Sequence, residues 1–330
     1  MPFAPKNKVL VDLLEKHAGV KRSSCRTYVS QIMRIHKDLH PGSPPPTNFR
    51  WLDTKQVVNY IKKLTPLVRL KNIATAALSG LRTLKVSKQR AAILKLLMQA
   101  DAAYRQFLKH RPARRPFKDA VAEMKKIKEL PATIARVVNG LGLWSKGKFV
   151  NYREYMLLQH LLFAHFIVES PPRRLEYADT RLITREQFDK LGGDRDKFNY
   201  IVMQPRGAWQ WHMYNYKTAK SGGAVVVQLP ATLKRYLKRF APIILAKNPE
   251  GWLFQGTRWQ RMSRPAFSGF VKKFFAKYMG KKSWTMNTLR SAFVSSYYKN
   301  VPDDIQEISR QMGHSIETAL THYKEPDNSS

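Results

Sequence analysis

The feature that most restricts the fold of this chain is the spacing of its hydrophobic residues, which is helical along most of its length. The clearest run lies on one helical face, with apolar residues at intervals of four, three and four: Tyr28, Ile32, Ile35 and Leu39. Ser23 or Ser24 could cap that helix. Four prolines, a glycine and a serine fill the segment Pro41–Pro46, which therefore predicts a loop.

Strand-like segments are confined to the second half of the chain. Three short runs rich in Val, Tyr and Trp are separated by turns that contain glycine: Tyr200–Gln204, Trp209–Tyr216 and Ala224–Leu229. Helices are predicted near residues 54–64, 70–84, 88–108, 117–130, 132–141, 152–169, 231–247, 264–278, 285–298, 303–312 and 315–322. The pattern predicts a mainly α fold with a small antiparallel β-sheet, of the α+β class.

The length of 330 residues suits two domains. Gly, Trp, Ser and Lys gather in residues 140–148, a composition typical of a linker. We therefore predict an all-helical domain at residues 1–148 and a second domain, which contains the sheet, at residues 149–330.

The charge of the chain favours a polyanionic partner. Its 59 Lys and Arg against 23 Asp and Glu give a formal net charge of +36. Residues 1–150 hold 31 basic and 8 acidic residues, a net charge of +23. We therefore expect the first half to bind a polyanion more strongly than the second. Double-stranded DNA is the expected partner, and a basic protein that only coats nucleic acid is the simpler alternative.

Other classes of protein receive no support from the sequence. The single cysteine, Cys25, excludes an intramolecular disulfide and a Cys-rich zinc module. The most apolar run, Met156–Val168, is too short to cross a bilayer and is interrupted by polar residues. The N-terminus does not resemble a signal peptide. We expect an intracellular protein that works at DNA, with no cofactor, no metal, no membrane contact and no small-molecule substrate.

The most specific pattern lies near the C-terminus. Asn287 stands three residues before Arg290, the pair Gly313-His314 follows with His314 twenty-four residues after that arginine, and Tyr323 comes nine residues later. This order and spacing resemble the active-site signature of the tyrosine recombinase (phage integrase) family, whose catalytic domain is similar to that of type IB topoisomerases.

Two upstream positions extend the resemblance. Arg173 and Glu176 have the spacing of the family's first catalytic arginine and the glutamate that follows it, with Arg174 as an alternative to Arg173. The family also places a lysine in the turn between its second and third strands. Lys217 matches it in kind and place, and Lys220 is the alternative.

The resemblance implies a role for each residue. Arg173 and Arg290 would bind the nonbridging oxygens of a DNA phosphodiester, because guanidinium groups bind them bidentately and stay protonated. Tyr323 would attack the phosphorus and form a 3′-phosphotyrosyl bond. Lys217 would protonate the departing 5′ oxygen as a general acid, and His314 would hydrogen-bond the phosphate.

Asn287 departs from the family pattern, which has histidine at this position. An amide can donate or accept a hydrogen bond but cannot carry a proton, so we expect altered proton handling on the tyrosine. A type IB topoisomerase or a hairpin telomere resolvase would use the same chemistry, and a non-catalytic DNA-binding relative is a further alternative. A metal-dependent transposase is disfavoured, since the sequence offers no clear carboxylate triad.

The resemblance also implies an assembly. Members of the family clamp DNA between a helical core-binding domain and the catalytic domain, and four protomers act on two duplexes. We therefore expect a homotetramer on DNA. Only Lys324–Ser330 follow the tyrosine here, and Pro326 interrupts them. Deleting residues 326–330 should leave DNA-dependent assembly intact.

Overall fold

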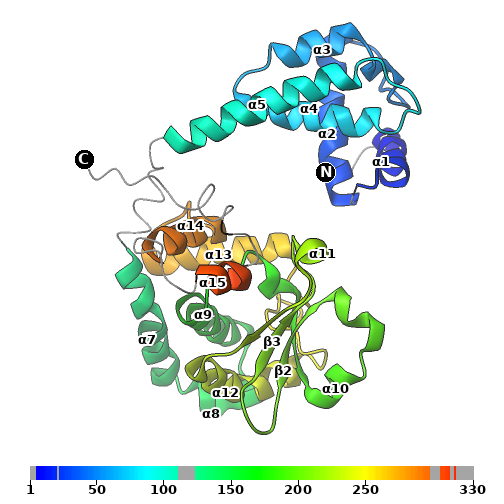
Figure 1. Ribbon diagram of the computed structural model, residues 1–330. Coiled ribbons are helices and arrows are strands. Elements are labelled where there is room, and N and C mark those ends of the chain that lie inside the picture. The colour runs from blue at the N-terminus through cyan, green and yellow to red at the C-terminus, as the bar shows by residue number, and fades with distance from the viewer. Residues whose placement is uncertain (1–4, 21, 111–122, 298–304, 313–315, 317–330) are drawn as a thin grey trace. The chain divides into compact units, whose positions relative to one another are not determined.

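The computed structural model describes residues 5–20, 22–110, 123–297, 305–312 and 316. The chain forms two compact units, Met1–Arg111 and Pro112–Ser330 (Figure 1). The helix at Met124–Gly140 therefore belongs with the second unit, whereas the sequence placed it before a boundary near residue 148. Each unit is described by itself below.

The first unit is helical throughout its described part. Its elements are α1 (Pro5–Ala18), α2 (Arg22–Leu39), η1 (Arg50–Leu52), α3 (Lys55–Lys62), α4 (Leu67–Leu81) and α5 (Arg90–His110). Ile32 and Ile35 of α2 are fully buried, as the predicted stripe requires. The expected N-cap is wrong, because α2 begins at Arg22 and Ser23 and Ser24 both lie in its first turn.

The second unit carries the sheet. Its helices are α7 (Met124–Gly140), α8 (Leu143–Lys146), α9 (Tyr152–Glu169), α10 (Arg185–Asp189), α11 (Ala219–Gly222), α12 (Ala231–Lys247), α13 (Arg264–Met279), α14 (Met286–Tyr297) and α15 (Ile305–Met312). The strands are β1 (Thr180–Thr184), β2 (Asn199–Met203), β3 (Gln210–Met213) and β4 (Val225–Gln228). Short 3-10 turns are η2 (Gly147–Phe149), η3 (Glu176–Asp179) and η4 (Gly192–Lys197).

The sheet is small, as predicted, but mixed rather than antiparallel. Its strand order is β1-β2-β3-β4, and β1 runs parallel to β2 while the other two pairs are antiparallel. The sequence did not predict β1. This strand has only five residues and its burial does not alternate, so it gives no two-residue period to detect.

The first helical segments of the second unit also differ from expectation. Residues 132–141 were predicted to start a new helix after Pro131, yet α7 runs through this proline without a break. Its buried face continues on both sides of the proline, from Ile127 to Val138, and packing there outweighs the lost backbone hydrogen bond. The expected linker at residues 140–148 forms the short turns α8 and η2.

Helix α9 passes through the core of this unit. A capping box starts it: Asn151 accepts from the backbone N–H of Glu154 at 3.0 Å, and the Glu154 carboxylate accepts from that of Asn151 at 2.9 Å. Phe163, fully buried, meets Phe274 of α13 edge to face with ring centroids 4.9 Å apart. Burial on several sides explains why the helix lacks a marked polar face.

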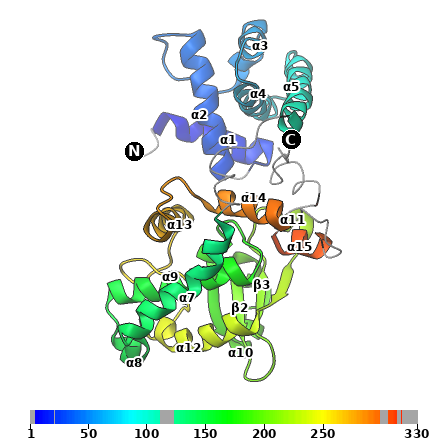
Figure 2. The ribbon, with the colours of Figure 1, turned by 90° about the vertical axis from the view of Figure 1, so that its left-hand side faces the viewer.

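Four helices of the second unit lie together at one of its ends. Figures 1 and 2 show α11, α13, α14 and α15 at this end, and α8 and α12 at the opposite end. None of the helices in the described part of the chain is long and apolar enough to cross a membrane.

Candidate active site

Arg290 is held in the middle of α14 with no solvent exposure. The helix starts at a reciprocal pair in which Thr285 and Thr288 accept from each other's backbone N–H, both at 3.3 Å. From there Arg290 points inward, and its Nη1 donates to the carbonyl oxygens of Pro172 at 2.7 Å and Met312 at 3.1 Å. One guanidinium therefore joins the segment after α9 to the end of α15.

Arg173 also binds the C-terminal end of α15, from the segment between α9 and η3. It lies between α9 and η3 and is 1% exposed. Its backbone N–H donates to the Tyr177 hydroxyl at 3.0 Å, and its Nη1 donates to the carbonyl oxygen of Gln311. The two arginines thus bind the last two carbonyls of α15, where the helix carries its partial negative charge.

Two N–H groups of the Arg173 guanidinium are not used in hydrogen bonds to described residues. Among the residues that the structure describes, its Nε and Nη2 have no hydrogen-bond partner although both atoms are buried. Burial lowers the pKa of Arg173; Glu176 opposes this shift, and the nearby charge of Arg290 adds to it. Buried guanidinium donors are costly when unused, and an anionic group can accept from both of them at once.

The loop that carries Lys217 is fixed by a buried amide. Asn199, at the start of β2, accepts from the backbone N–H groups of Tyr214 at 3.0 Å and Asn215 at 2.8 Å. Its Nδ2 donates to the carbonyls of Glu176 at 3.3 Å and Asn215 at 3.2 Å. This side chain therefore ties the segment after Arg173 to the segment before Lys217.

A second support comes from α13. Arg264 donates through Nη2 to the carbonyl oxygen of Asn215 at 3.3 Å and to its side-chain oxygen at 3.2 Å. The Nε of Arg264 lies 2.5 Å from the carboxylate of Asp179, which is 6% exposed. The loop is held from both the sheet and the helix.

Tyr216 connects this loop to Arg173 directly. The guanidinium carbon of Arg173 lies 5.1 Å from the centre of the Tyr216 ring, and the Tyr216 hydroxyl donates to the carbonyl of Gly223 at 2.6 Å. Lys217, the next residue, is exposed. The contact of Tyr216 with Arg173 therefore places the backbone of Lys217 one residue from that contact.

The predicted site residues thus fall into three groups. The structure brings Arg173 and Arg290 together, and the alternative, Arg174, is half-buried. Asn287 is exposed in the first turn of α14. His314 and Tyr323 lie outside the described residues.

Sequence reasoning missed the residues that hold these groups in place: Tyr177, Asp179, Asn199, Tyr216 and Arg264. Their partners lie 4 to 85 residues away along the chain. The sequence does show Asn199 next to a predicted strand and Tyr216 beside Lys217. Neither residue type indicates which distant residue it will contact.

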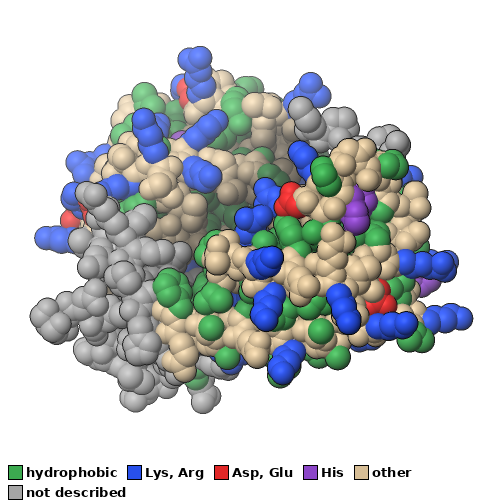
Figure 3. Space-filling model, turned by 90° about the horizontal axis from the view of Figure 1, so that it is seen from above, with side chains coloured by type: hydrophobic (Ala, Val, Ile, Leu, Met, Phe, Trp, Pro, Cys, Tyr) green, Lys and Arg blue, Asp and Glu red, His purple; other side chains and the backbone are tan. Residues whose placement is uncertain are grey.

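The molecule offers a basic surface to a polyanion. On the face drawn in Figure 3, Lys and Arg side chains are spread over the surface and few Asp or Glu side chains interrupt them. Such a surface attracts nucleic acid irrespective of sequence.

Comparison with known proteins agrees with the C-terminal pattern. Residues 207–329 match the model of the phage integrase family. The match includes Lys217, Asn287, Arg290, His314 and Tyr323, and it begins after Arg173. The resemblance to this family is confirmed over residues 207–329.

One solved structure, titled "Crystal structure of XerA recombinase", is similar over 97% of this chain and 94% of that chain, with 14% sequence identity and a TM-score of 0.38. No curated protein matches the sequence.

Proposed function

We propose that this protein is a site-specific DNA recombinase of the tyrosine recombinase type, which cleaves and rejoins strands through a 3′-phosphotyrosyl bond to Tyr323. The observation that carries the proposal is the meeting of two buried arginines, Arg173 and Arg290, at the end of α15. The phage integrase match over residues 207–329 supports it.

The arginine pair suits the transition state of phosphodiester attack. Charge develops on the nonbridging oxygens, and preorganised donors in a buried site stabilise it at little cost of reorganisation. The Nε and Nη2 groups of Arg173 are buried donors that have no hydrogen-bond partner among the described residues. They form one edge of the guanidinium, and such an edge binds a phosphate through two parallel hydrogen bonds.

The remaining roles follow from position in the chain. His314 comes two residues after Met312 and Tyr323 nine residues after that, so both belong to the segment that begins where the arginines bind α15. The phenol, with an ordinary pKa of about 10, loses its proton as it attacks. Lys217 returns a proton to the departing 5′ oxygen. The phosphotyrosyl bond conserves the energy of the broken linkage, so rejoining needs no nucleotide hydrolysis.

DNA binding rests mainly on charge. With a net charge of +36, the protein gains affinity by releasing counterions from phosphates, and its affinity falls steeply as salt rises. The same charge keeps free protomers apart. We therefore infer that the homotetramer assembles on DNA, which neutralises the repulsion.

Suicide DNA substrates test the chemistry. Duplexes nicked near candidate ends of the source genome release a short strand on cleavage and trap the covalent adduct, which a denaturing gel separates from free DNA. Wild type should form the adduct, and Tyr323→Phe should bind DNA but form none. Tyr278→Phe is the matched control, since it removes a hydroxyl whose hydrogen-bond partner is His160 and not either arginine, and it should behave as wild type. Adduct formation by Tyr323→Phe would refute the assignment of the nucleophile.

Asn287 gives a reason to keep one alternative, a DNA-binding relative without catalysis. The family's histidine would take part in proton transfer at this position, and the amide cannot. If the site is active but handles protons poorly, Asn287→His should raise the cleavage rate. If wild type and Asn287→His both bind DNA without any adduct, the non-catalytic alternative holds. Relaxation of supercoiled plasmid that lacks target sites would instead indicate a type IB topoisomerase.

A further inference from the structure

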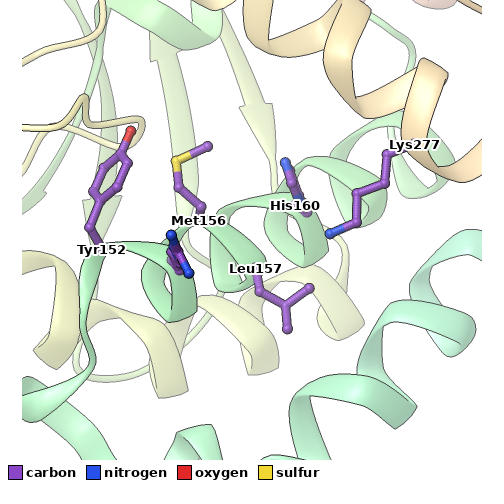
Figure 4. A pocket seen from close by; sticks show the side chains of 6 residues that line it. Tyr152, Met156, Leu157, His160 and Lys277 are labelled. Atoms are coloured by element: carbon purple, nitrogen blue, oxygen red, sulfur yellow. The ribbon is translucent and has the colours of Figure 1, made fainter.

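A second concave site lies between α9 and α13, away from the arginine pair. A cavity of about 880 Å³ is lined by these two helices and by residues 256–263, and an adjoining cavity of about 360 Å³ shares four of its residues. Figure 4 shows Tyr152, Met156 and His160 along one side of α9 in this region. The size is that of a site for a small organic ligand, and neither Arg173, Arg290 nor Lys217 lines it.

The charge of this cavity has one sign. Lys273 and Lys277 of α13 line it together with Arg261, and no Asp or Glu does so among the described residues. Arg261 already pairs with Asp179 at 3.7 Å. The two lysines make no ion pair within the described part of the chain, and Lys277 extends its ammonium group toward α9 (Figure 4). They are positioned to receive an anionic group.

The remainder of the lining is mixed: Thr257, Gln260 and Ser263 are polar, and the other side chains are apolar or aromatic. Tyr152, Met156 and Phe270 are among the apolar and aromatic members. His160 lies against Phe270 with ring centroids 5.2 Å apart, and its Nδ1 is 3.1 Å from the Tyr278 hydroxyl. Burial, and to a lesser degree the charge of Lys277, lowers the pKa of His160 to about 4, so the ring is neutral near pH 7. A flat, uncharged ring system fits such a surface.

We propose that this cavity is a nucleotide-binding site, in which a base lies against Tyr152 and Phe270 and a phosphate binds Lys273 and Lys277. Aromatic side chains stack on any base, and lysines bind phosphate as point charges. A free nucleoside phosphate and one nucleotide of a DNA strand share this chemistry. The site is separate from the proposed strand cleavage and does not depend on it.

Gly269 provides a way to fill the cavity. It lies in α13 and lines the cavity, and a Cβ added there would meet no atom within 4 Å. A larger side chain should therefore enter the empty space without displacing its neighbours. Replacing a helix-interior glycine also removes backbone entropy from the unfolded chain. Gly269→Leu should thus block the cavity while the thermal midpoint stays the same or rises.

The test is fluorescence anisotropy of a fluorescent adenosine monophosphate at 150 mM salt. Wild type should bind one equivalent, and Gly269→Leu should weaken binding at least tenfold. The double variant Lys273→Ala and Lys277→Ala should do the same. Lys272→Ala is the matched control, because it removes the same charge from an exposed position of α13 outside the cavity, and it should change affinity less than twofold. Equal losses in Lys272→Ala and the lysine pair, or wild-type affinity in Gly269→Leu, would overturn the site.

Competition defines the ligand. Unlabelled adenosine and inorganic phosphate should each compete at least tenfold more weakly than adenosine monophosphate, and phosphate that competed equally well would overturn the nucleotide assignment. A single-stranded oligonucleotide that displaces the probe from wild type identifies a DNA strand as the source. Displacement by mononucleotides alone identifies a free nucleotide. If Gly269→Leu shows no cooperative melt, the comparison of the lysine pair with Lys272→Ala decides the result.

Discussion

The guanidinium carbon of Arg173 lies 5.1 Å from the centre of the Tyr216 ring. This contact joins the segment after α9 to the residue that precedes Lys217, so the proposed phosphate-binding group and the proposed general acid share one support. The Tyr216 hydroxyl closes the loop by donating to the carbonyl of Gly223 at 2.6 Å. The Tyr216 ring therefore contacts Arg173, whereas its hydroxyl holds the loop at Gly223. Substitutions that remove only the hydroxyl, or the whole ring, can separate these two contributions.

Tyr216→Phe keeps the ring against Arg173 and loses the hydrogen bond to Gly223. It should lower the free energy of unfolding by about 1 kcal/mol and slow DNA cleavage by less than tenfold. Tyr216→Leu also removes the ring, and a cation–π contact of this kind contributes roughly 0.5–2 kcal/mol. We expect cleavage by Tyr216→Leu to fall at least tenfold in single-turnover assays on suicide substrates. Equal rates in the two variants would show that the ring does not position the site.

Arg173 and Arg174 form a natural matched pair, because they are adjacent and equally charged but only the first is buried beside Arg290. Lysine cannot present two parallel donors to a phosphate. Arg173→Lys should therefore slow cleavage by about 10²–10³-fold, the usual effect of losing one preorganised donor. Arg174→Lys should stay within a few-fold of wild type. The reverse order of effects would assign the catalytic role to Arg174.

Much of the fold followed from hydrophobic spacing. Helix α12 has the predicted bounds, Ala231–Lys247, because its apolar residues keep a clear helical period. β1 was missed because its pairing partner, β2, lies across the intervening η4 and α10, and parallel pairing leaves no hairpin signal. The break predicted at Pro131 was wrong because packing on both sides of the proline overrode its local preference.

The candidate site was predictable only where a residue belongs to a sequence motif. Arg173 and Arg290 stand out by their spacing within a motif, and the structure brings them together. Asn199 and Arg264 do not, since their function is to hold Asn215, which lies 16 and 49 residues away in the chain. Such contacts arise from the tertiary arrangement and leave no local pattern.

His160 should make stability depend on pH. Its pKa is lowered to about 4 by burial and by the charge of Lys277, while the unfolded chain has the ordinary value of 6.5. The unfolded state therefore binds the proton more tightly, and stability is complete above pH 6.5 and is lost as pH falls toward 4. The full loss should be about 3 kcal/mol, because each unit of pKa between 6.5 and about 4 corresponds to 1.36 kcal/mol.

Urea unfolding of wild type and His160→Gln between pH 7 and pH 4.5 measures this contribution. The difference in unfolding free energy between the two proteins should narrow as the pH falls. Parallel curves would mean that His160 does not titrate differently in the folded and unfolded states.

Cleavage should not require a divalent cation, because the proposed mechanism assigns charge stabilisation to Arg173 and Arg290 and protonation to Lys217. Adduct formation on a suicide substrate should proceed at the same rate with excess EDTA as without it. Complete inhibition by EDTA, restored by added magnesium, would place the protein in a metal-dependent class instead.

The central claim is that Tyr323 becomes covalently bound to DNA. The most direct measurement is mass spectrometry of the trapped adduct after digestion with protease and nuclease. We predict that the residual nucleotide is found on the peptide that contains Tyr323, attached through the phenolic oxygen to a 3′-phosphate. A nucleotide on another residue, or a 5′-phosphate linkage, would contradict the account.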